Sequence, residues 1–173
     1  MCTANICRSP MMEAWARHLL GRDADDVAVS SAGARGLEGE PMHPLAVQAL
    51  RERGAAPGGF VARQLRPEWV GAADLTLTAD RWHRDLLLDH VPDAFGRLFT
   101  LRECAWLLAG SPVTGVGDVS SLARVADDRR RTAGRAVPND LDLGDPVGRD
   151  IQAFRDCLDS ISAAVSLLVQ ALR

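Results

Sequence analysis

The chain has 173 residues, of which 47% are hydrophobic and 25% charged, a balance typical of a single globular domain with one core. Its formal net charge of -3 argues against a nucleic-acid surface and against a polybasic membrane anchor. The sequence has no apolar run that could cross a bilayer and no secretory signal pattern. Four cysteines without the spacing of a disulfide framework favour a reducing, cytoplasmic setting. We therefore expect one cytoplasmic domain over residues 1–173.

The opening segment carries the strongest chemical pattern, Cys2-Thr3-Ala4-Asn5-Ile6-Cys7-Arg8-Ser9-Pro10. Ser9 and Pro10 are typical of a helix start, so we expect a helix over residues 10–21. The backbone between Cys2 and Arg8 can curl with its amides inward, which forms an anion-binding nest at the positive end of that helix. Arg8 adds a charged fork suited to two phosphate oxygens, and the same positive field favours the thiolate of Cys2. The segment predicts a phosphate-binding loop with its own nucleophile.

The rest of the chain alternates between apolar runs of strand and helix type. We expect strands over residues 27–31, 74–78 and 97–101. Further helices are expected over residues 44–53, 81–90 (capped by Asp80), 102–109, 122–131 and 150–172. This alternation predicts an α/β fold with a parallel sheet, helices on both faces, and ligands bound at the carboxyl ends of the strands.

Two segments late in the chain differ from this pattern. Residues 110–139 are rich in Gly, Ser, Pro and basic residues, which predicts a mobile surface excursion around a short helix. A turn-rich acidic loop follows at residues 140–148. Asp145 in this loop is a candidate general acid, with Asp140 and Asp142 as alternatives.

Taken together, these motifs resemble the low-molecular-weight protein tyrosine phosphatase family. The opening signature is the most specific part, and the likeness extends over nearly the whole chain. The other segments that fit are Ser31-Ala32-Gly33, Pro41-Met42-His43-Pro44, Ala62-Arg63-Gln64-Leu65, Ala73-Asp74-Leu75 and Asp145-Pro146. The resemblance implies a flavodoxin-like three-layer sandwich, with a four-stranded parallel sheet and helices on both faces.

The resemblance also implies roles for the site residues. Cys2 is the expected nucleophile, Arg8 the phosphate clamp and Asp145 the general acid that later activates water. The expected phosphate-binding residues are Thr3, Ala4, Asn5, Ile6, Cys7, Arg8 and Ser9. The implied partners are tyrosine-phosphorylated proteins, no metal or other cofactor is implied, and the oligomeric state is left open.

This chain departs from the family pattern at its first residues. Family members have a buried strand before the cysteine, whereas only Met1 precedes Cys2 here. We therefore expect the first strand to be missing or truncated and the natural product to begin upstream, because a sheet without its middle strand leaves backbone groups unpaired.

A second departure concerns the wall of the substrate pocket. The family places aromatic residues after the Asp-Pro pair, but Val147 and Gly148 stand there in this chain, which has no tyrosine. Leu37 and Val147 are the candidates for an apolar wall. A related branch that acts on phosphoarginine has threonine at the position of Ile6, so Ile6 favours phosphotyrosine.

Several alternatives remain open. Cys7 is a candidate redox partner that could form a reversible disulfide with Cys2, or it could simply fill the loop. A protein-arginine phosphatase of the same fold and a catalytically impaired phosphate-binding module are the alternative functions. A thiol-cascade arsenate reductase is disfavoured, because no cysteine lies between Cys7 and Cys104.

Overall fold

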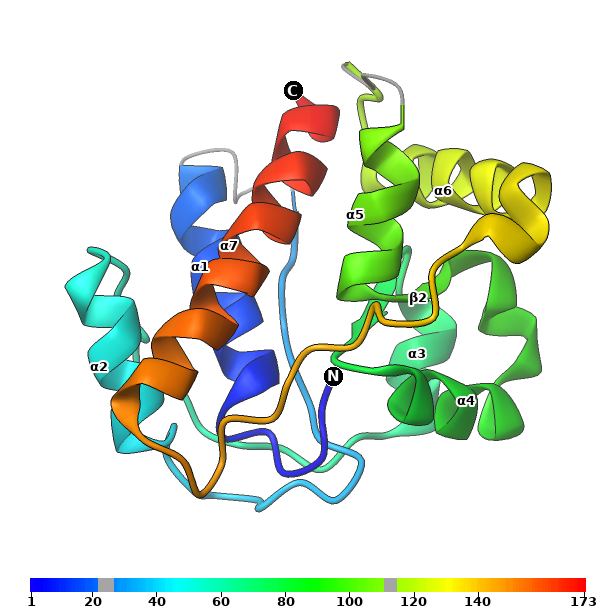
Figure 1. The fold of residues 1–173 in the computed structure, drawn as a ribbon. Helices are drawn as coiled ribbons and strands as arrows, with labels where there is room; N and C mark the ends of the chain where they lie inside the picture. Colours follow the sequence, from blue (N-terminus) through cyan, green and yellow to red (C-terminus); the bar gives the residue numbers. More distant parts are fainter. Residues whose placement is uncertain (22–26, 111–114) are drawn as a thin grey trace.

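The computed structural model describes residues 1–21, 27–110 and 115–173 (Figure 1). Helices α1, α2 and α7 fill the left half of this view, and α3 to α6 surround the strands in the right half. The α-helices are α1 (Arg8–Leu20), α2 (Pro44–Glu52), α3 (Pro67–Ala72), α4 (Arg81–His90), α5 (Leu101–Ala109), α6 (Val119–Ala133) and α7 (Ile151–Leu172). The strands are β1 (Thr76–Thr78) and β2 (Leu98–Thr100), and the 3-10 helices are η2 (Pro92–Arg97) and η3 (Gly134–Ala136).

The structure corrects the predicted four-stranded sheet. Within the described ranges there is one sheet, in which β1 and β2 pair in parallel. The strands predicted at residues 74–78 and 97–101 are thus confirmed but shortened to three residues each. Beyond them, isolated bridges join Gly33 to Cys2 and to Gln64. Helices therefore supply most of the regular structure.

The strand predicted at residues 27–31 is wrong, because this stretch forms no strand ladder. Its carbonyl oxygens are bonded by side chains. The guanidinium of Arg17 donates to the carbonyl of Val29, and the guanidinium of Arg63 donates to that of Ser31. Apolar patterning alone could not reveal that arginine side chains take the place of a neighbouring strand.

The backbone of Met1 and Cys2 lies between this stretch and β1. The amino group of Met1 donates to the carbonyl of Leu77 at 2.6 Å, and the amide of Ala79 donates to the carbonyl of Met1 at 2.9 Å. Next to these bonds lies an apolar groove of about 260 Å³, lined by residues of the 27–32 stretch, α1, β1 and α7. The phosphate loop is therefore attached to the sheet through a very short stretch of backbone.

The helix boundaries refine the sequence-based expectations. α1 begins at Arg8, two residues before the predicted start, and Ser9 therefore lies inside the helix instead of capping it. Gly21 ends α1 with a φ of 57°, and the carboxylate of Asp80 caps α4 by accepting from the amide of His83. The sequence analysis missed α3, although Pro67 at its first position is a typical start signal.

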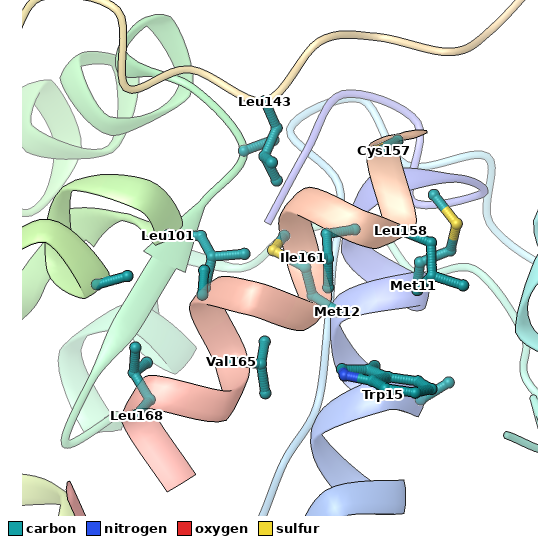
Figure 2. Packing of buried hydrophobic residues seen from close by; sticks show 14 of the residues in the cluster. Met11, Met12, Trp15, Leu101, Leu143, Cys157, Leu158, Ile161, Val165 and Leu168 are labelled. Atoms are coloured by element: carbon teal, nitrogen blue, oxygen red, sulfur yellow. The ribbon is translucent and has the colours of Figure 1, made fainter. Parts of the chain in front are cut away.

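Helix α7 organises the larger of two apolar clusters (Figure 2). Its buried side chains face α1 and α5, and the labelled contacts include Leu158, Ile161, Met11, Trp15 and Leu101. A smaller cluster contains Val70 of α3, Leu87 of α4 and Leu98 of β2. Apolar side chains thus pack on both sides of the strands, which preserves a layered arrangement around a short sheet.

Two further expectations concern the late helices. Of the predicted excursion at residues 110–139, residues 111–114 lie outside the described residues. Helix α6 is longer than predicted and buries Leu122 and Ala126. The mobility of the segment stays a prediction. Although α7 has 22 residues, neither it nor any other helix of the described ranges is long and apolar enough to span a membrane.

Two leucines of α7 offer a matched test of the core. Leu158 is fully buried, whereas Leu167 is 36% exposed. We expect Leu158→Ala to lower the free energy of unfolding by about 2–5 kcal/mol, because it removes buried methyl groups and leaves a cavity. Leu167→Ala should lower the free energy of unfolding by much less, because the Leu167 side chain is already partly exposed. Urea unfolding followed by circular dichroism measures both, and equal losses would contradict the packing described for α7.

Candidate active site

The phosphate loop, residues 2–8, turns its carbonyl oxygens outward. Five loop carbonyls, those of Cys2, Thr3, Ala4, Ile6 and Cys7, accept from the amides of Ala34, Arg35, Leu37, His43 and Met11, respectively. Within the described part of the chain, no carbonyl or side chain accepts a hydrogen bond from the amides of residues 3–7. Helix α1 starts at the end of the loop with no acidic residue in its first turn and no side-chain cap. Free amides and a helix N-terminus together form a site for an anion.

Asn5 shapes the middle of the loop. It is fully buried and has a φ of 57°, a left-handed conformation that asparagine tolerates better than most residues. Its side-chain amide donates to the hydroxyl of Ser9 at 2.9 Å and to that of Ser31 at 2.8 Å, while its oxygen accepts from the amide of Arg63 at 2.9 Å. Ser31 donates onward to Glu13 at 2.7 Å. The loop conformation is thus held by three separate segments of the chain.

The same bonds orient the Ser9 hydroxyl toward Cys2. Because the Asn5 amide group can only donate, Ser9 Oγ accepts from it and keeps its own proton for another acceptor. Cys2 Sγ lies 3.0 Å from Ser9 Oγ and is that acceptor. A hydrogen bond received by the sulfur stabilises the thiolate form, which is the nucleophilic form of cysteine.

Arg8 is buried between two carboxylates from distant parts of the chain. Its Nη1 donates to Asp80 Oδ2 at 2.9 Å and to the carbonyl of Leu143 at 3.3 Å, and its Nη2 donates to Asp145 Oδ2 at 2.7 Å. Arg8 Nε is buried and has no hydrogen-bond partner among the described residues. An unpaired buried donor is costly, and an anion held in the loop is the kind of group that would satisfy it.

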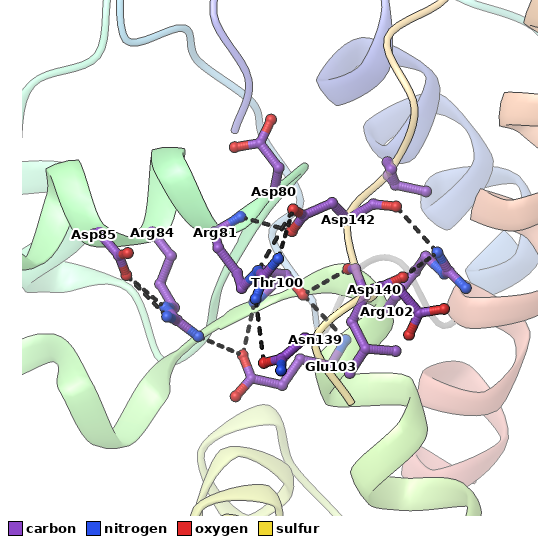
Figure 3. Close-up of polar contacts among 12 residues, drawn as sticks. Asp80, Arg81, Arg84, Asp85, Thr100, Arg102, Glu103, Asn139, Asp140 and Asp142 are labelled. Carbon is purple, nitrogen blue, oxygen red and sulfur yellow. Dashed lines mark hydrogen bonds and ion pairs between the residues drawn. The ribbon is translucent and has the colours of Figure 1, made fainter. Parts of the chain in front are cut away.

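Backbone contacts at the ends of β1 and β2 position the loop that carries Asp145. The amide of Leu143 donates to the carbonyl of Ala79, and the Thr100 hydroxyl donates to the carbonyl of Leu141. Figure 3 shows Asp142 accepting from the amide of Arg81 at the start of α4. Of the three acidic candidates, the structure therefore brings Asp145 to Arg8 and uses Asp142 to anchor the loop.

Asp145 remains accessible although it pairs with Arg8. Its side chain is 49% exposed, and its second oxygen accepts from the amide of Val147 at 3.1 Å. Leu37 lies beside the phosphate loop, because its amide donates to the carbonyl of Ala4 at 3.0 Å. The side chains of Leu37 and Val147 are both exposed. Leu37 therefore adjoins the phosphate loop through its backbone, and Val147 adjoins Asp145.

Cys7 is a buried thiol with little nucleophilic character of its own. Burial, followed by the nearby Cys2 and Asp145, raises the pKa of Cys7 to about 12. Burial likewise raises the pKa of Cys157 to about 12. Both groups are therefore protonated at neutral pH, and a thiol must lose its proton before it attacks another sulfur.

His83 was not predicted from the sequence as a site residue, and Asp80 was predicted only as a helix cap. Burial acts to raise the pKa of Asp80, but hydrogen bonds from His83 and the charge of Arg8 hold it below its usual value. Burial lowers the pKa of His83, and Asp80 opposes this effect only in part. The three-residue spacing of Asp80 and His83 at a helix start was the available signal. Within the described ranges, no group of three or more His, Cys, Asp or Glu residues is arranged to hold a metal ion.

The chain is similar to known phosphatases over its whole length. The sequence profile of the family described as low molecular weight phosphotyrosine protein phosphatase matches residues 1–107. A probable low molecular weight protein-tyrosine-phosphatase, EpsP of Ralstonia nicotianae, is 27% identical over 100% of this chain and 93% of its own length. The protein-arginine-phosphatase of Geobacillus stearothermophilus is 26% identical over the same shares of the two chains.

A solved structure has the same overall fold. It is the YwlE arginine phosphatase, in a mutant with a phosphorylated active site serine. It is 26% identical, covers 99% of this chain and 91% of its own, and superposes with a TM-score of 0.73. The short sheet of this chain therefore lies within the same overall arrangement of elements as in that phosphatase.

Gly33 tests whether the loop depends on close backbone packing. A Cβ at this position would lie 2.4 Å from the carbonyl oxygen of Thr3 and 2.9 Å from the nitrogen of Asn5. We expect Gly33→Ala to lower the free energy of unfolding by about 2 kcal/mol or more and to weaken binding of inorganic phosphate, because backbone atoms must move. The matched control is Gly59→Ala, where a Cβ meets nothing within 4 Å. Urea unfolding and calorimetry measure both effects; equal behaviour of the two variants would contradict the packing.

The four cysteines should differ sharply in reactivity. We expect iodoacetate at pH 7 to modify Cys2 first in the folded protein, and inorganic phosphate to slow that reaction by occupying the loop. All four cysteines are buried, Cys2 included, so burial alone does not distinguish them. Burial raises the pKa of Cys7, Cys104 and Cys157 to about 12, whereas Cys2 Sγ lies 3.0 Å from the Ser9 hydroxyl, so the other three should react only after unfolding. Peptide mass mapping over time distinguishes the sites. Modification of Cys7 as fast as Cys2 would refute this assignment.

Proposed function

We propose that this chain, which belongs to the low molecular weight phosphotyrosine protein phosphatase family, removes phosphate from phosphotyrosine in proteins. The phosphate loop carries the proposal. Its amides at residues 3–7 lack acceptors among the described residues, and the buried Arg8 Nε lacks one as well. Cys2 Sγ belongs to the same loop and accepts from Ser9. A phosphoryl group supplies the missing acceptors and an electrophile for the sulfur.

In the first step, the Cys2 thiolate attacks phosphorus, and the bond from phosphorus to the substrate oxygen breaks. The loop amides and Arg8 hold the equatorial oxygens. The dianionic phosphoryl group displaces Asp145 from Arg8 Nη2, because both are anions that bind the same cation. Once displaced, the Asp145 carboxylate takes a proton from solvent and gives it to the departing oxygen. The products of this step are the dephosphorylated substrate and a phosphocysteine.

In the second step, water attacks the phosphocysteine. The carboxylate of Asp145 takes a proton from the water as the new bond to phosphorus forms and the bond from sulfur to phosphorus breaks. Ser9 donates to the Cys2 sulfur and so stabilises the thiolate as a leaving group. Inorganic phosphate leaves with Cys2 again a thiolate, and Asp145 releases the proton to solvent as it pairs with Arg8 again. The cycle balances without a metal or other cofactor.

The entrance of the site favours an aromatic substrate. Ile6 is half-buried within the loop, and Leu37 and Val147 are exposed beside it. Three apolar side chains offer a surface on which a phenyl ring can bury area, whereas a phosphoarginine side chain carries a polar guanidino group that prefers hydrogen-bonding partners. Protein-arginine phosphatase is the second candidate, since relatives with either name are similarly close to this chain.

Cys7 is proposed as a redox partner of Cys2. Peroxide would oxidise the Cys2 thiolate to a sulfenic acid, and attack by Cys7 sulfur would form a disulfide and release water. The raised pKa of Cys7, about 12, slows this attack at neutral pH. The reaction would therefore serve as slow protection of Cys2, reversed by a thiol reductant.

The proposed setting is the reducing cytoplasm, with tyrosine-phosphorylated proteins as partners. All four cysteines are free, and the proposed nucleophile must remain a thiol to work. The exposed apolar side chains of Leu37 and Val147 suit peptide side chains on the surface of a partner protein.

Hydrolysis of para-nitrophenyl phosphate tests the proposal. We expect turnover by the wild type, inhibition by orthovanadate and no turnover by Cys2→Ser, because the hydroxyl is a far weaker nucleophile. Asp145→Asn should lower kcat by roughly 10²–10⁴ because it removes the proton donor. The control Asp140→Asn changes an exposed acid of the same loop and should retain wild-type kcat.

Peptide substrates then decide the specificity. We expect a higher kcat/KM for a phosphotyrosine peptide than for the matched phosphoarginine peptide. A higher kcat/KM for the phosphoarginine peptide would instead support protein-arginine phosphatase activity. No turnover of any of these substrates by folded wild type would reject the enzyme and leave a phosphate-binding module.

A further inference from the structure

We infer that His83 is a positioning residue that joins the two ends of the phosphate loop. It does so by connecting Thr3, near the start of the loop, with Asp80, the carboxylate that holds Arg8 at its end. The inference rests on the proposed phosphate-binding function and extends it to a residue on α4, outside the loop.

Three short contacts form a continuous chain of side chains. His83 is almost completely buried in the first turn of α4. Its Nε2 lies 2.9 Å from Thr3 Oγ1, and its Nδ1 lies 2.5 Å from Asp80 Oδ1. The other oxygen of Asp80 accepts from Arg8 Nη1 at 2.9 Å. Residues at both ends of the loop are therefore linked to the start of one helix.

The chemistry of these groups allows one consistent arrangement of protons. The carboxylate of Asp80 can only accept, so His83 Nδ1 must carry the proton of that bond. Burial lowers the pKa of His83 and favours the neutral ring, whose Nε2 then has a lone pair. Thr3 consequently donates its hydroxyl proton to Nε2. The direction of each bond is fixed, which restricts the rotamers of Thr3 and Asp80.

The loop needs this support because the sheet gives it little. Among the described residues, Cys2 pairs in an isolated bridge with Gly33, which lies outside the sheet, and Met1 bonds to Leu77 of β1 and to Ala79. Asn5 holds the middle of the loop from the side of Ser31 and Arg63. His83 holds its start from the opposite element, α4. Its contacts thereby keep the amides of residues 3–7 and the Arg8 fork in one orientation.

A purely structural role for His83 makes a different prediction. The ring also makes an edge contact with Trp82, with 4.9 Å between centroids, and its burial contributes to packing. If packing were its whole contribution, substitution would lower the stability of the protein without any dependence on the Thr3 hydroxyl. Coupling between Thr3 and His83 in phosphate binding therefore separates the two roles.

The test is a double-mutant cycle on the full chain, read by calorimetric binding of inorganic phosphate. His83→Asn keeps an amide donor near the position of Nδ1 for Asp80 but has no group at the position of Nε2. Thr3→Val removes the hydroxyl and keeps the shape. We expect each to weaken phosphate binding about tenfold, and the double variant to be no weaker than either, because both remove the same bond.

Two further variants complete the design. His83→Gln keeps an amide near the position of Nε2 but loses the donor to Asp80, so it should weaken phosphate binding through Arg8 even when Thr3 is intact. His90→Asn changes an exposed histidine at the other end of α4 and should leave phosphate affinity and activity unchanged. Urea unfolding of every variant measures stability separately from binding.

The outcomes separate the inference from the proposed function. Wild-type phosphate affinity in His83→Asn, or additive losses in the double variant, would overturn the inference alone. A wild type that binds no phosphate would overturn both. A wild type that binds phosphate with the expected coupling but hydrolyses no phosphate ester would reject the enzyme and retain the role of His83. If His83→Asn fails to fold, unchanged affinity in Thr3→Val would overturn the inference.

Discussion

The burial of the Arg8 guanidinium is the constraint on which this structure depends. A charge removed from water must be paired, and a buried cation left without partners would be severely destabilising. Asp80 comes from the end of β1 and Asp145 from the loop before α7, so the requirement brings three distant segments to one point. Asp145 is half exposed, whereas Asp80 is less exposed and also bonds His83. In the proposed function, Asp80 keeps the cation in place while phosphate takes the position of Asp145.

The site also shows how side chains compensate for a short sheet. Arg17 and Arg63 bond the carbonyls of the extended 27–31 stretch, and Asn5 and His83 hold the phosphate loop from two sides. Each is a specific polar contact between segments far apart in the sequence. The apolar layers around α7 and around α4 supply the general stability, and the polar contacts determine the conformation of the loop.

Much of the local structure followed from the sequence because its causes are local. The helices at residues 44–53, 81–90 and 150–172 and the strands at residues 74–78 and 97–101 were predicted from periodicity, caps and apolar runs, with boundaries within a few residues. The phosphate loop was recognised because its function needs particular residues at fixed spacing within nine consecutive positions. The family followed from the same segment and from the short motifs downstream of it.

The sequence by itself therefore determined the family and most helices and predicted the nucleophile, since neighbouring residues decide these features. Only the tertiary structure decided that Asp145 and not Asp142 meets Arg8, because both lie in one acidic loop and differ only in what they contact. It alone also reduced the expected sheet to two strands and brought His83 to Thr3. The physical reason is that hydrogen bonds across 80 residues of chain depend on packing of whole elements, which no local pattern encodes.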